Sequence, residues 1–498
     1  MKHKKISSVL SITLALILGL LPVVLAQFLY PDFIPEETYL HLVFINGLLN
    51  GEGFSFTGQI TYGSISPLWL ILGSFVSILT DDPEFSLRLL SGIFSFLSVI
   101  LFLKLADVLK IKSTIKFIAA LSFCLNPIFL RWSINGLEAT AALAFFLFLI
   151  YAYSDRYHIR HPYIYGLLLG SASLLRPEFI LFSFIFILNQ FILNKHHRLK
   201  TTITSIILLV FISVWMLFTY MHFGTIVPNV FKLIAGTGFI ESSTEESFRN
   251  IKLLLGGNIP EFMLLVIITI VIFILASKRD QNFVEEFVRL LERLRFNGML
   301  IGLTFFISLY AYFIIKGITI TQFNLVFIPL LVLMIAALIN LLSDYKTKFN
   351  VSLISVYAVL ILLIHSHMTF TIIKPASDIY IKGYHNSYKE VANFIRTDEF
   401  KDIKTVAVRD AGIIGYYSEA RVYDLSGLTN NERFNFNSDY EFIEYKKPDY
   451  LVLKNESELS DLLSEEVQTT IIYQRDIPVI EVGENEIQTI ILYRIYWE

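Results

Sequence analysis

Long apolar stretches separated by short polar segments repeat along the first three quarters of the chain. The first follows the basic amino end, Met1 to Lys5, and continues to Tyr30. It exceeds the roughly 7–15 residues of a signal-peptide core, so it is interpreted as a membrane span. Further candidate spans follow at residues 84–109, 114–131, 138–154, 162–175, 178–193, 201–221, 258–276, 298–315, 322–342 and 349–368. Because a helix needs roughly 17–25 apolar residues to cross a bilayer, the pattern predicts a polytopic α-helical membrane protein with about 11 spans.

The stretch Ser66–Thr80 is shorter than a usual span and runs into Asp81-Asp82-Pro83. If it stays on the outer surface, most Lys and Arg residues of the loops fall on the cytoplasmic side, whereas a crossing there would reverse that bias. The positive-inside rule therefore predicts that 66–80 does not cross. It also predicts a cytoplasmic amino terminus, an outer loop over 31–83 that carries surface helices, and an extracytoplasmic carboxyl-terminal region.

The composition changes at about Ser377. Charged residues, Pro, Gly and Asn become frequent there, and short β-rich stretches replace the long apolar ones. This change indicates a transmembrane module over 1–376 and a soluble α/β domain over 377–498. The predicted helix and strands of that domain are 387–396, then 405–408, 450–453, 470–473 and 489–493. Residues 283–296 carry apolar side chains at helical spacing between charges, which predicts an amphipathic helix on the cytoplasmic surface.

Composition and motifs exclude several classes of protein. The chain is 55% hydrophobic and 17% charged, and its net charge of −3 does not favour a nucleic-acid partner. Its one cysteine, Cys124, excludes disulfides within the chain and Cys-based metal sites. The sequence contains no Walker A, HExxH or GxSxG motif, and no GxGxxG in a βαβ context.

Polar residues at the outer ends of the predicted spans are the remaining chemical signal. An ionisable group costs about 2.5–3.5 kcal/mol at a span centre, so such residues near hydrocarbon need an explanation. Each also has a simpler interpretation: first-turn acids favour the helix dipole, one glutamate could cap a span, an arginine could snorkel, and a lysine could be an ordinary loop residue. The four groups, all on one side in this topology, are Asp32 with Glu36-Glu37, Asn135-Gly136-Leu137-Glu138, Arg176-Pro177-Glu178, and Pro228-Asn229 with Lys232.

Several runs, taken in order, resemble a known family. Those of the first outer loop are Glu36-Glu37-Thr38-Tyr39, the run from Asn46 to Phe54, and the run from Tyr62 to Trp69. They resemble the first outer loop of the GT-C superfamily of lipid-linked-sugar glycosyltransferases, in particular the mycobacterial terminal arabinofuranosyltransferase type. Similar matches continue along nearly the whole chain, at Asp82-Pro83-Glu84 with Arg88, 136–138, 176–178, 224–232, 410–418 and 424–429.

Two departures from the family pattern bear on activity. The acidic pair is normally Asp-Asp, and here it is Glu36-Glu37. An extra methylene moves a carboxylate by roughly 1 Å, a displacement that can cost about 10²-fold in rate. Relatives also tend to have an Arg in the span that follows Lys316, where this chain has Gln322 and Asn324.

The resemblance implies transfer of a hexosyl or pentosyl group from a polyprenyl-phosphate donor to a glycan, lipid or protein acceptor, at the outer face of the cell membrane. Such a reaction needs a carboxylate base and a cation beside the leaving phosphate. Glu36 or Glu37 is the expected base, with Glu36 favoured because it matches the first acid of the family pair. Arg176 and Lys232 are the expected phosphate ligands.

Other residues are expected to support this chemistry. Glu138, Glu178 and Asn229 would position acceptor hydroxyls or hold Arg176, and Asp32 is an alternative acid. No nucleotide cofactor is needed. A divalent cation, Mg²⁺ or Mn²⁺, would find oxygen ligands in Glu36, Glu37 and Glu138.

Two other classes of function are compatible with the sequence. A transporter or lipid flippase would also have many spans and intramembrane charges, although neither an inverted nor a parallel repeat is apparent. A non-catalytic scaffold is compatible with the Glu-Glu pair, and its outer domain would then bind a glycan or a protein partner.

Overall fold

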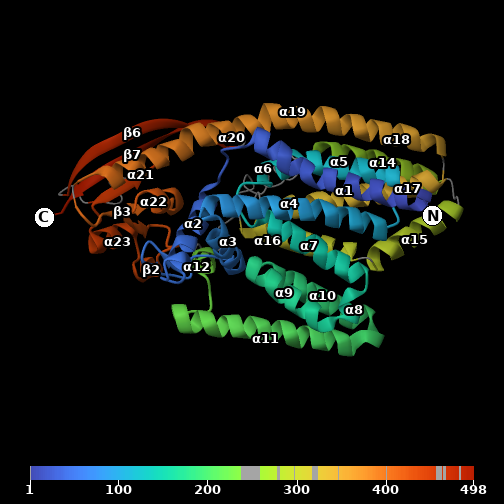
Figure 1. Ribbon diagram of the computed structural model, residues 1–498, viewed down its shortest axis with the longest axis horizontal. Coiled ribbons are helices and arrows are strands. Elements are labelled where there is room, and N and C mark those ends of the chain that lie inside the picture. Colours follow the sequence, from blue (N-terminus) through green and yellow to red (C-terminus); the bar gives the residue numbers. More distant parts are fainter. Residues whose placement is uncertain are drawn as a thin grey trace.

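The computed structural model describes residues 2–236, 258–277, 281–296, 298–316, 324–345, 347–399, 401–455, 463, 467–481 and 484–497. Figure 1 shows an elongated molecule whose helices run mainly along the long axis. The amino terminus lies at one end of the helical bundle, and a mixed sheet lies at the opposite end of the molecule.

Each predicted span contains a helix, and the span predicted over 114–131 is interrupted at Asn126, where α5 ends. The helices are α1 (Lys2–Leu29), α4 (Pro83–Val108), α5 (Ser113–Leu125), α7 (Ala139–Ser154), α9 (Pro162–Leu175), α10 (Phe179–Leu193), α11 (Arg198–Phe223), α14 (Ile259–Ser277), α16 (Met299–Lys316), α17 (Asn324–Tyr345) and α18 (Thr347–Leu360). Within the described ranges, five helices are long and apolar enough to cross a membrane alone, and a bent pair would make a sixth. Several others are shorter apolar helices packed in the bundle. The prediction of a multi-pass α-helical membrane protein is confirmed.

The last span continues without a break into the carboxyl-terminal domain, which is here called the outer domain after its predicted location. Helices α18, α19 (Ser366–Met368), α20 (Lys374–Tyr380) and α21 (Asn386–Thr397) are joined by π-helical turns at Ile361–His365, Thr369–Ile373 and Ile381–His385. The predicted helix over 387–396 is therefore the end of this continuous helix. π-Helical turns are rare and are often found at functional sites.

The outer domain contains a five-stranded mixed sheet. Its strands are β3 (Thr405–Val408), β4 (Arg421–Asp424), β5 (Tyr450–Leu453), β6 (Gln468–Glu481) and β7 (Glu484–Tyr496), in the order β4-β3-β5-β7-β6. Strand β3 is parallel to β4 and β5, whereas β6 and β7 form a long antiparallel hairpin. All four predicted strands are confirmed, and β4 is the one that the sequence pattern missed. Short helices α22 (Ala411–Tyr417) and α23 (Asp439–Lys446) complete the domain.

The first outer loop differs from its prediction in one respect. It contains α2 (Glu36–Leu49), the small hairpin β1 (Ser55–Phe56) and β2 (Gln59–Ile60), and α3 (Pro67–Thr80). Helix α2 does not lie on a surface, because residues around its whole circumference are buried. Phe44, in the middle of the helix, is 1% exposed and packs against Phe56. The helix is enclosed between the bundle and the outer domain, so its first turn lies at their junction.

The remaining helices are α6 (Pro127–Trp132), α8 (Tyr157–Arg160), α12 (Asn229–Gly236) and α15 (Gln281–Phe296). Helix α15 is the predicted amphipathic helix. Its position on the cytoplasmic surface stays a prediction.

Candidate active site at the junction of bundle and outer domain

A cavity of about 580 Å³ lies where α2, α6, the continuous helix and the outer domain meet. The bundle side contributes Phe33, Pro35, Glu36, Glu37, Leu40, Arg131, Trp132, Tyr380 and Tyr384, and the outer domain contributes Arg409, Asp410, Ala411, Asp424, Ser426 and Leu428. Acids, arginines and aromatic rings therefore share one space. This combination suits a ligand that has both sugar and phosphate groups.

Glu36 and Glu37 start α2 directly after Pro35, and both line the cavity. The Glu36 carboxylate is already occupied. Its Oε1 accepts the backbone N–H of Gly412 at 2.5 Å and that of Ile413 at 3.2 Å, at the start of α22. Gly412 allows this close approach, because a Cβ there would lie 2.6 Å from the Glu36 carbonyl oxygen. Glu36 thus joins α2 to the outer domain.

The pKa of Glu36 is raised to about 8, mainly by burial and by the nearby Asp410 carboxylate, and the two N–H donors only partly offset this rise. The surroundings of Glu36 are those of a docking contact between two parts of the molecule. These contacts favour Glu37 over Glu36 as the base, whereas the sequence pattern slightly favours Glu36, and the choice between them stays a prediction.

The Glu37 carboxylate is free. Its side chain is exposed to the cavity, and no described residue donates a side-chain hydrogen bond to it or forms an ion pair with it. The enclosing protein raises its pKa by desolvation, and the Glu138 and Asp410 carboxylates add to that rise. A carboxylate with a raised pKa and open access has the properties of a general base.

Arg131, at the end of α6, is a free cation in the same cavity. Its guanidinium lies 4.3 Å from the centre of the Phe33 ring, and its buried Nε has no hydrogen-bond partner. No carboxylate among the described residues forms an ion pair with it. No motif in the sequence marked this arginine as a site residue. The available signal was its position directly before Trp132, four residues before Asn135.

Arg176, an expected phosphate ligand, lies instead in a buried cluster, here called the Glu138–Arg176 cluster. Its Nη1 donates to Glu138 Oε1 at 2.9 Å and its Nε to Glu178 Oε2 at 3.4 Å. His41 of α2 lies 3.8 Å from the other Glu138 oxygen. Arg176 is 5% exposed and Glu138 3% exposed. Of the two roles predicted for Glu138 and Glu178, the geometry matches holding Arg176.

The turn that carries Glu138 fixes α2 in place. Gly136 has a φ of +89°, and a Cβ there would lie 2.6 Å from the Thr38 side chain. The Thr38 hydroxyl donates to the Asn135 carbonyl at 3.0 Å, and Trp69 Nε1 donates to the Gly136 carbonyl at 3.1 Å. The Asn-Gly-Leu-Glu motif therefore positions the start of α2.

Like Glu138, Arg176 and Glu178, three further predicted site residues do not line the cavity. Asn229 is fully buried, and its Nδ2 donates to Thr61, to the Leu428 carbonyl and to Asn431, so it joins α12 to the first loop and the outer domain. Lys232 lies over the Phe434 ring at 5.4 Å, and the structure does not bring it to Arg176. Asp32 is exposed in the turn after α1. Gln322 lies outside the described residues, as does the side chain of Asn324.

The three acids expected to bind a divalent cation do not form a metal site. The Glu36 oxygens face backbone N–H groups, and Glu138 is held by Arg176, which leaves only Glu37. Across the described ranges, no group of three or more His, Cys, Asp or Glu side chains could hold a metal ion.

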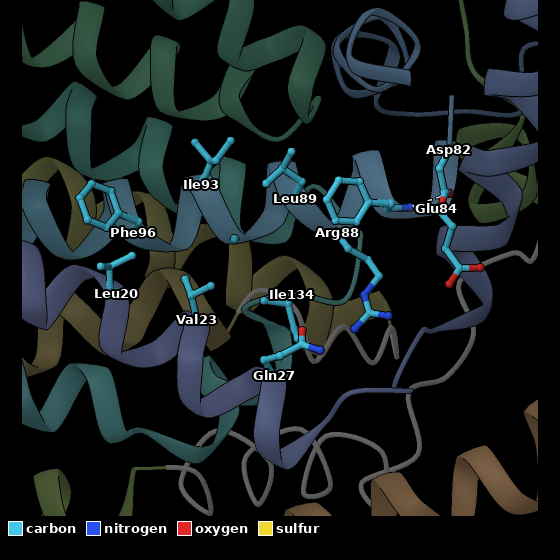
Figure 2. A pocket seen from close by; sticks show the side chains of 12 residues that line it. Leu20, Val23, Gln27, Asp82, Glu84, Arg88, Leu89, Ile93, Phe96 and Ile134 are labelled. Atoms are coloured by element: carbon cyan, nitrogen blue, oxygen red, sulfur yellow. Dashed lines mark hydrogen bonds between the residues drawn. The ribbon is translucent and has the colours of Figure 1, made fainter. Parts of the chain in front are cut away.

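A second hollow, of about 750 Å³, lies between α1 and α4 (Figure 2). Its inner walls are apolar side chains, including Leu20, Val23 and Ile93. Its other end is polar and is lined by Gln27, Arg88, Asp82 and Glu84. Arg88 Nη2 donates to the Pro31 carbonyl at 2.5 Å, which joins this hollow to the loop that leads from α1 to the cavity.

Comparison with solved structures identifies the fold. ArnT from Cupriavidus metallidurans bound to undecaprenyl phosphate superposes with a TM-score of 0.62 and 12% identity over 97% of both chains. The apo state gives a TM-score of 0.60. The oligosaccharyltransferase of Archaeoglobus fulgidus, in complex with Zn and sulfate, gives 0.57 and 15% identity over 89% of this chain and 68% of its own. These neighbours are GT-C glycosyltransferases.

The chain has the GT-C fold. At these identities the similarity establishes the architecture only, and the resemblance to the arabinofuranosyltransferase type stays a prediction. A family model described as a domain of unknown function (DUF8728) matches residues 377–491 of the outer domain. A search of curated protein sequences gave no match. Within the GT-C fold, the cavity lies between the membrane bundle and the outer domain, in reach of groups from both.

Proposed function

We propose that the protein is a membrane glycosyltransferase that moves a sugar from a polyprenyl-phosphate donor to a hydroxyl group of a glycan, lipid or protein. The observation that carries the proposal is the cavity, which holds a free carboxylate, Glu37, and a free guanidinium, Arg131, between aromatic side chains. These are the two groups that the reaction requires. The shared fold with ArnT, whose structure holds undecaprenyl phosphate, supports the choice of donor.

In the proposed reaction, the acceptor oxygen attacks the anomeric carbon and the bond from that carbon to the phosphate oxygen breaks. Glu37 takes the proton of the acceptor hydroxyl, a contribution of about 10²–10⁴-fold. Arg131 stabilises the negative charge that develops on the leaving polyprenyl phosphate. Arg131 thus takes the role that the sequence motifs predicted for Arg176 and Lys232.

A lipid donor fits the surroundings of the cavity. The hollow between α1 and α4 is apolar along the bundle, as a hydrocarbon chain requires, and Arg88 lines its polar end together with Asp82 and Glu84. We place the cavity at the outer face and the amino terminus in the cytoplasm, on the basis of the distribution of Lys and Arg. Labelling of an Ile403→Cys variant that lacks Cys124 tests this orientation, because Ile403 is 78% exposed on the outer domain. A label that reacts only after permeabilisation would contradict it.

The decisive experiment measures donor binding and transfer together. The full chain, purified in lipid nanodiscs, should bind undecaprenyl phosphate, and Arg131→Gln should weaken that binding by about tenfold or more, because a charge-assisted hydrogen bond is worth roughly 1.5–3 kcal/mol. Lipid extracts of a deletion strain should accumulate a polyprenyl-phosphate sugar that the purified protein consumes.

The matched control is Arg421→Gln, which removes the same charge from an exposed position at the start of β4. It should leave binding unchanged. If undecaprenyl phosphate does not bind, or if Arg131→Gln and Arg421→Gln bind it equally well, the glycosyltransferase proposal fails. The scaffold or transporter interpretation would then be preferred.

A further inference from the structure

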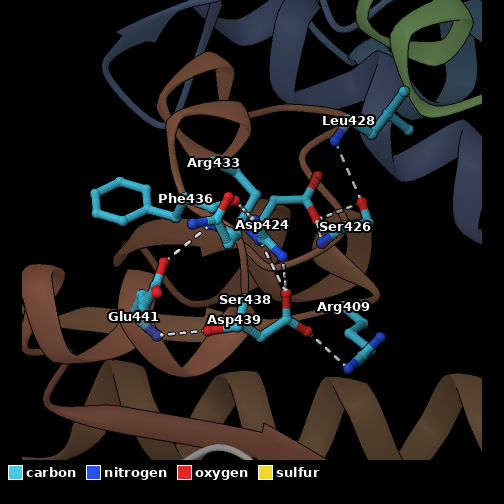
Figure 3. A network of polar contacts seen from close by, with 10 residues as sticks. Arg409, Asp424, Ser426, Leu428, Arg433, Phe436, Ser438, Asp439 and Glu441 are labelled. Atoms are coloured by element: carbon cyan, nitrogen blue, oxygen red, sulfur yellow. Dashed lines mark hydrogen bonds and ion pairs between the residues drawn. The ribbon is translucent and has the colours of Figure 1, made fainter. Parts of the chain in front are cut away.

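A second arginine faces the cavity from the outer domain. Arg409 follows β3, lines the cavity, and has a side chain that is 53% exposed. Its Nη2 donates to Asp439 Oδ2 at 2.7 Å (Figure 3). It lies on the wall opposite the bundle, whereas Arg131 comes from the bundle itself. The mechanism proposed above uses only Arg131, so Arg409 has no assigned role in it.

Arg409 shares the carboxylate of Asp439 with Arg433. Arg433 donates to Asp439 Oδ1 through both Nε, at 2.9 Å, and Nη2, at 2.5 Å. Its Nη1 donates to the Phe436 carbonyl at 2.9 Å. Figure 3 shows the two guanidinium groups converging on the one carboxylate. Asp439 and Arg433 are 14% and 17% exposed. The more enclosed Arg433 thus makes two contacts with Asp439, and the more exposed Arg409 makes one.

The other acids on this wall are also occupied. Asp410 forms an ion pair with Lys454 at 2.7 Å and accepts the Tyr388 hydroxyl at 3.0 Å. Asp424 is buried and accepts bonds from the backbone and hydroxyl groups of Ser426 and Thr429. Neither carboxylate is available to Arg409. The Arg409 guanidinium is therefore the exposed cation that the outer wall presents to the cavity, and Asp439 is its ion-pair partner.

We infer that Arg409 binds an anionic group, a phosphate or a carboxylate, on the acceptor. The inference rests on the proposed function and adds the chemical class of its second substrate. A monophosphate donor brings one anionic group, which Arg131 can meet from the bundle side. An acceptor that enters below the outer domain would meet Arg409, held at a defined position by Asp439 and Arg433. Arg409 then orients the acceptor hydroxyl toward Glu37 and takes no part in proton transfer.

The test compares two soluble probes on the full chain with undecaprenyl phosphate already bound. Glucose 6-phosphate should bind about tenfold more tightly than glucose, because one charge-assisted contact is worth at least about 1.4 kcal/mol. Arg409→Gln should abolish this preference, and Arg409→Lys should restore part of it. Arg421→Gln, the matched removal of charge from the same domain, should leave the preference intact. Undecaprenyl phosphate should bind all of these variants equally.

Two results would overturn the inference. One is an equal affinity for the two probes, or a preference that survives in a folded Arg409→Gln variant. The other is an undecaprenyl diphosphate affinity that exceeds that for the monophosphate and falls on Arg409→Gln, which would assign Arg409 to a diphosphate donor. The effect of Arg131→Gln on donor binding tests the proposed function independently of Arg409. If Arg131→Gln weakens donor binding and Arg409→Gln changes nothing, only the acceptor assignment is wrong.

Discussion

The cavity and the Glu138–Arg176 cluster both contain a glutamate and an arginine, which are unpaired in the cavity and paired in the cluster. In the cavity, Glu37 and Arg131 have no ionic partner among the described residues. In the cluster, Glu138 and Arg176 are almost fully buried and bind each other at 2.9 Å. Both groups involve the first turns of α2. Glu37 of the cavity is its second residue, and His41 of the same helix lies beside Glu138 of the cluster. Their difference lies in solvent access and in whether each charge is already compensated.

This difference separates a structural role from a catalytic one. A buried ion pair is stable only when both partners remain, so neither charged group can bind a substrate unless the pair is broken. An open carboxylate and an open guanidinium can each bind a ligand without that cost. The cluster therefore positions α2, and α2 presents Glu37 to the cavity. Replacement of residues in the two groups should accordingly have different kinds of effect.

The largest expected effect on turnover is that of Glu37→Gln. Loss of a general base should lower kcat by about 10²-fold or more while binding of undecaprenyl phosphate persists. In the parent protein, activity should rise with pH through a pKa above the usual value of a glutamate, because the raised pKa of Glu37 keeps it protonated at lower pH. The Gln variant should lose this rise. Initial rates of transfer between pH 5 and 9 measure both quantities.

Glu52→Gln is the matched control, since Glu52 lies in the same loop after α2, is exposed and does not line the cavity. It should keep parental turnover. A Glu37→Gln variant with parental turnover would show that the base lies elsewhere.

Replacements in the Glu138–Arg176 cluster should act on stability first. Removal of one partner leaves an uncompensated buried charge, at a cost of about 3–5 kcal/mol. Arg176→Gln and Glu138→Gln should each lower the thermal midpoint strongly. The double variant should lose less than the sum of the two, because neither charge is then left alone. Thermal melts followed by fluorescence in nanodiscs measure this coupling. Strictly additive losses, or a stable Arg176→Gln variant with impaired donor binding, would return Arg176 to the donor site.

Much of the fold could be predicted because its physical basis is local. The apolar length of each span and the β-rich composition of four strands are properties of short segments, and the corresponding helices and strands formed. Strand β4, Arg421–Asp424, has a charged residue at each end, so its sequence shows no clear alternation of apolar and polar residues. The burial of α2 was missed for another reason. The outer domain that covers it is more than 300 residues away in the sequence, as in the Gly412 contact with Glu36 at a separation of 376.

The site was predictable as a set of residue types, but its assignments were not. The acid pair and the Glu138 and Arg176 motifs stand out because charges near hydrocarbon are rare. Whether a charge is compensated depends on contacts between distant segments, such as the 38 residues that separate Arg176 from Glu138. Arg131 stood in no charged motif, and Arg409 lay in the separate outer domain. The cavity becomes apparent only when the bundle and the outer domain are placed together.

The smallest expected effect is that of Glu36→Gln, which tests the docking contact between α2 and α22. Glutamine keeps an oxygen that can accept the N–H groups of Gly412 and Ile413, so turnover should fall by less than about tenfold, as expected for one modest hydrogen bond.

The pH dependence of stability should change more clearly in the Glu36→Gln variant. Because the pKa of Glu36 is raised to about 8 in the folded protein, from an ordinary value near 4.5, the folded state binds the extra proton between those values. Its contribution to stability is therefore fully present below pH 4.5 and is lost as the pH rises toward 8. The parent protein should thus melt at a lower temperature at pH 8 than at pH 5, and the Gln variant should show a smaller difference. Thermal melts of both proteins across that range measure it. A variant with the parental pH slope would mean that Glu36 is not the group that titrates, and a variant that loses turnover as severely as Glu37→Gln would give Glu36 a role in the chemistry itself.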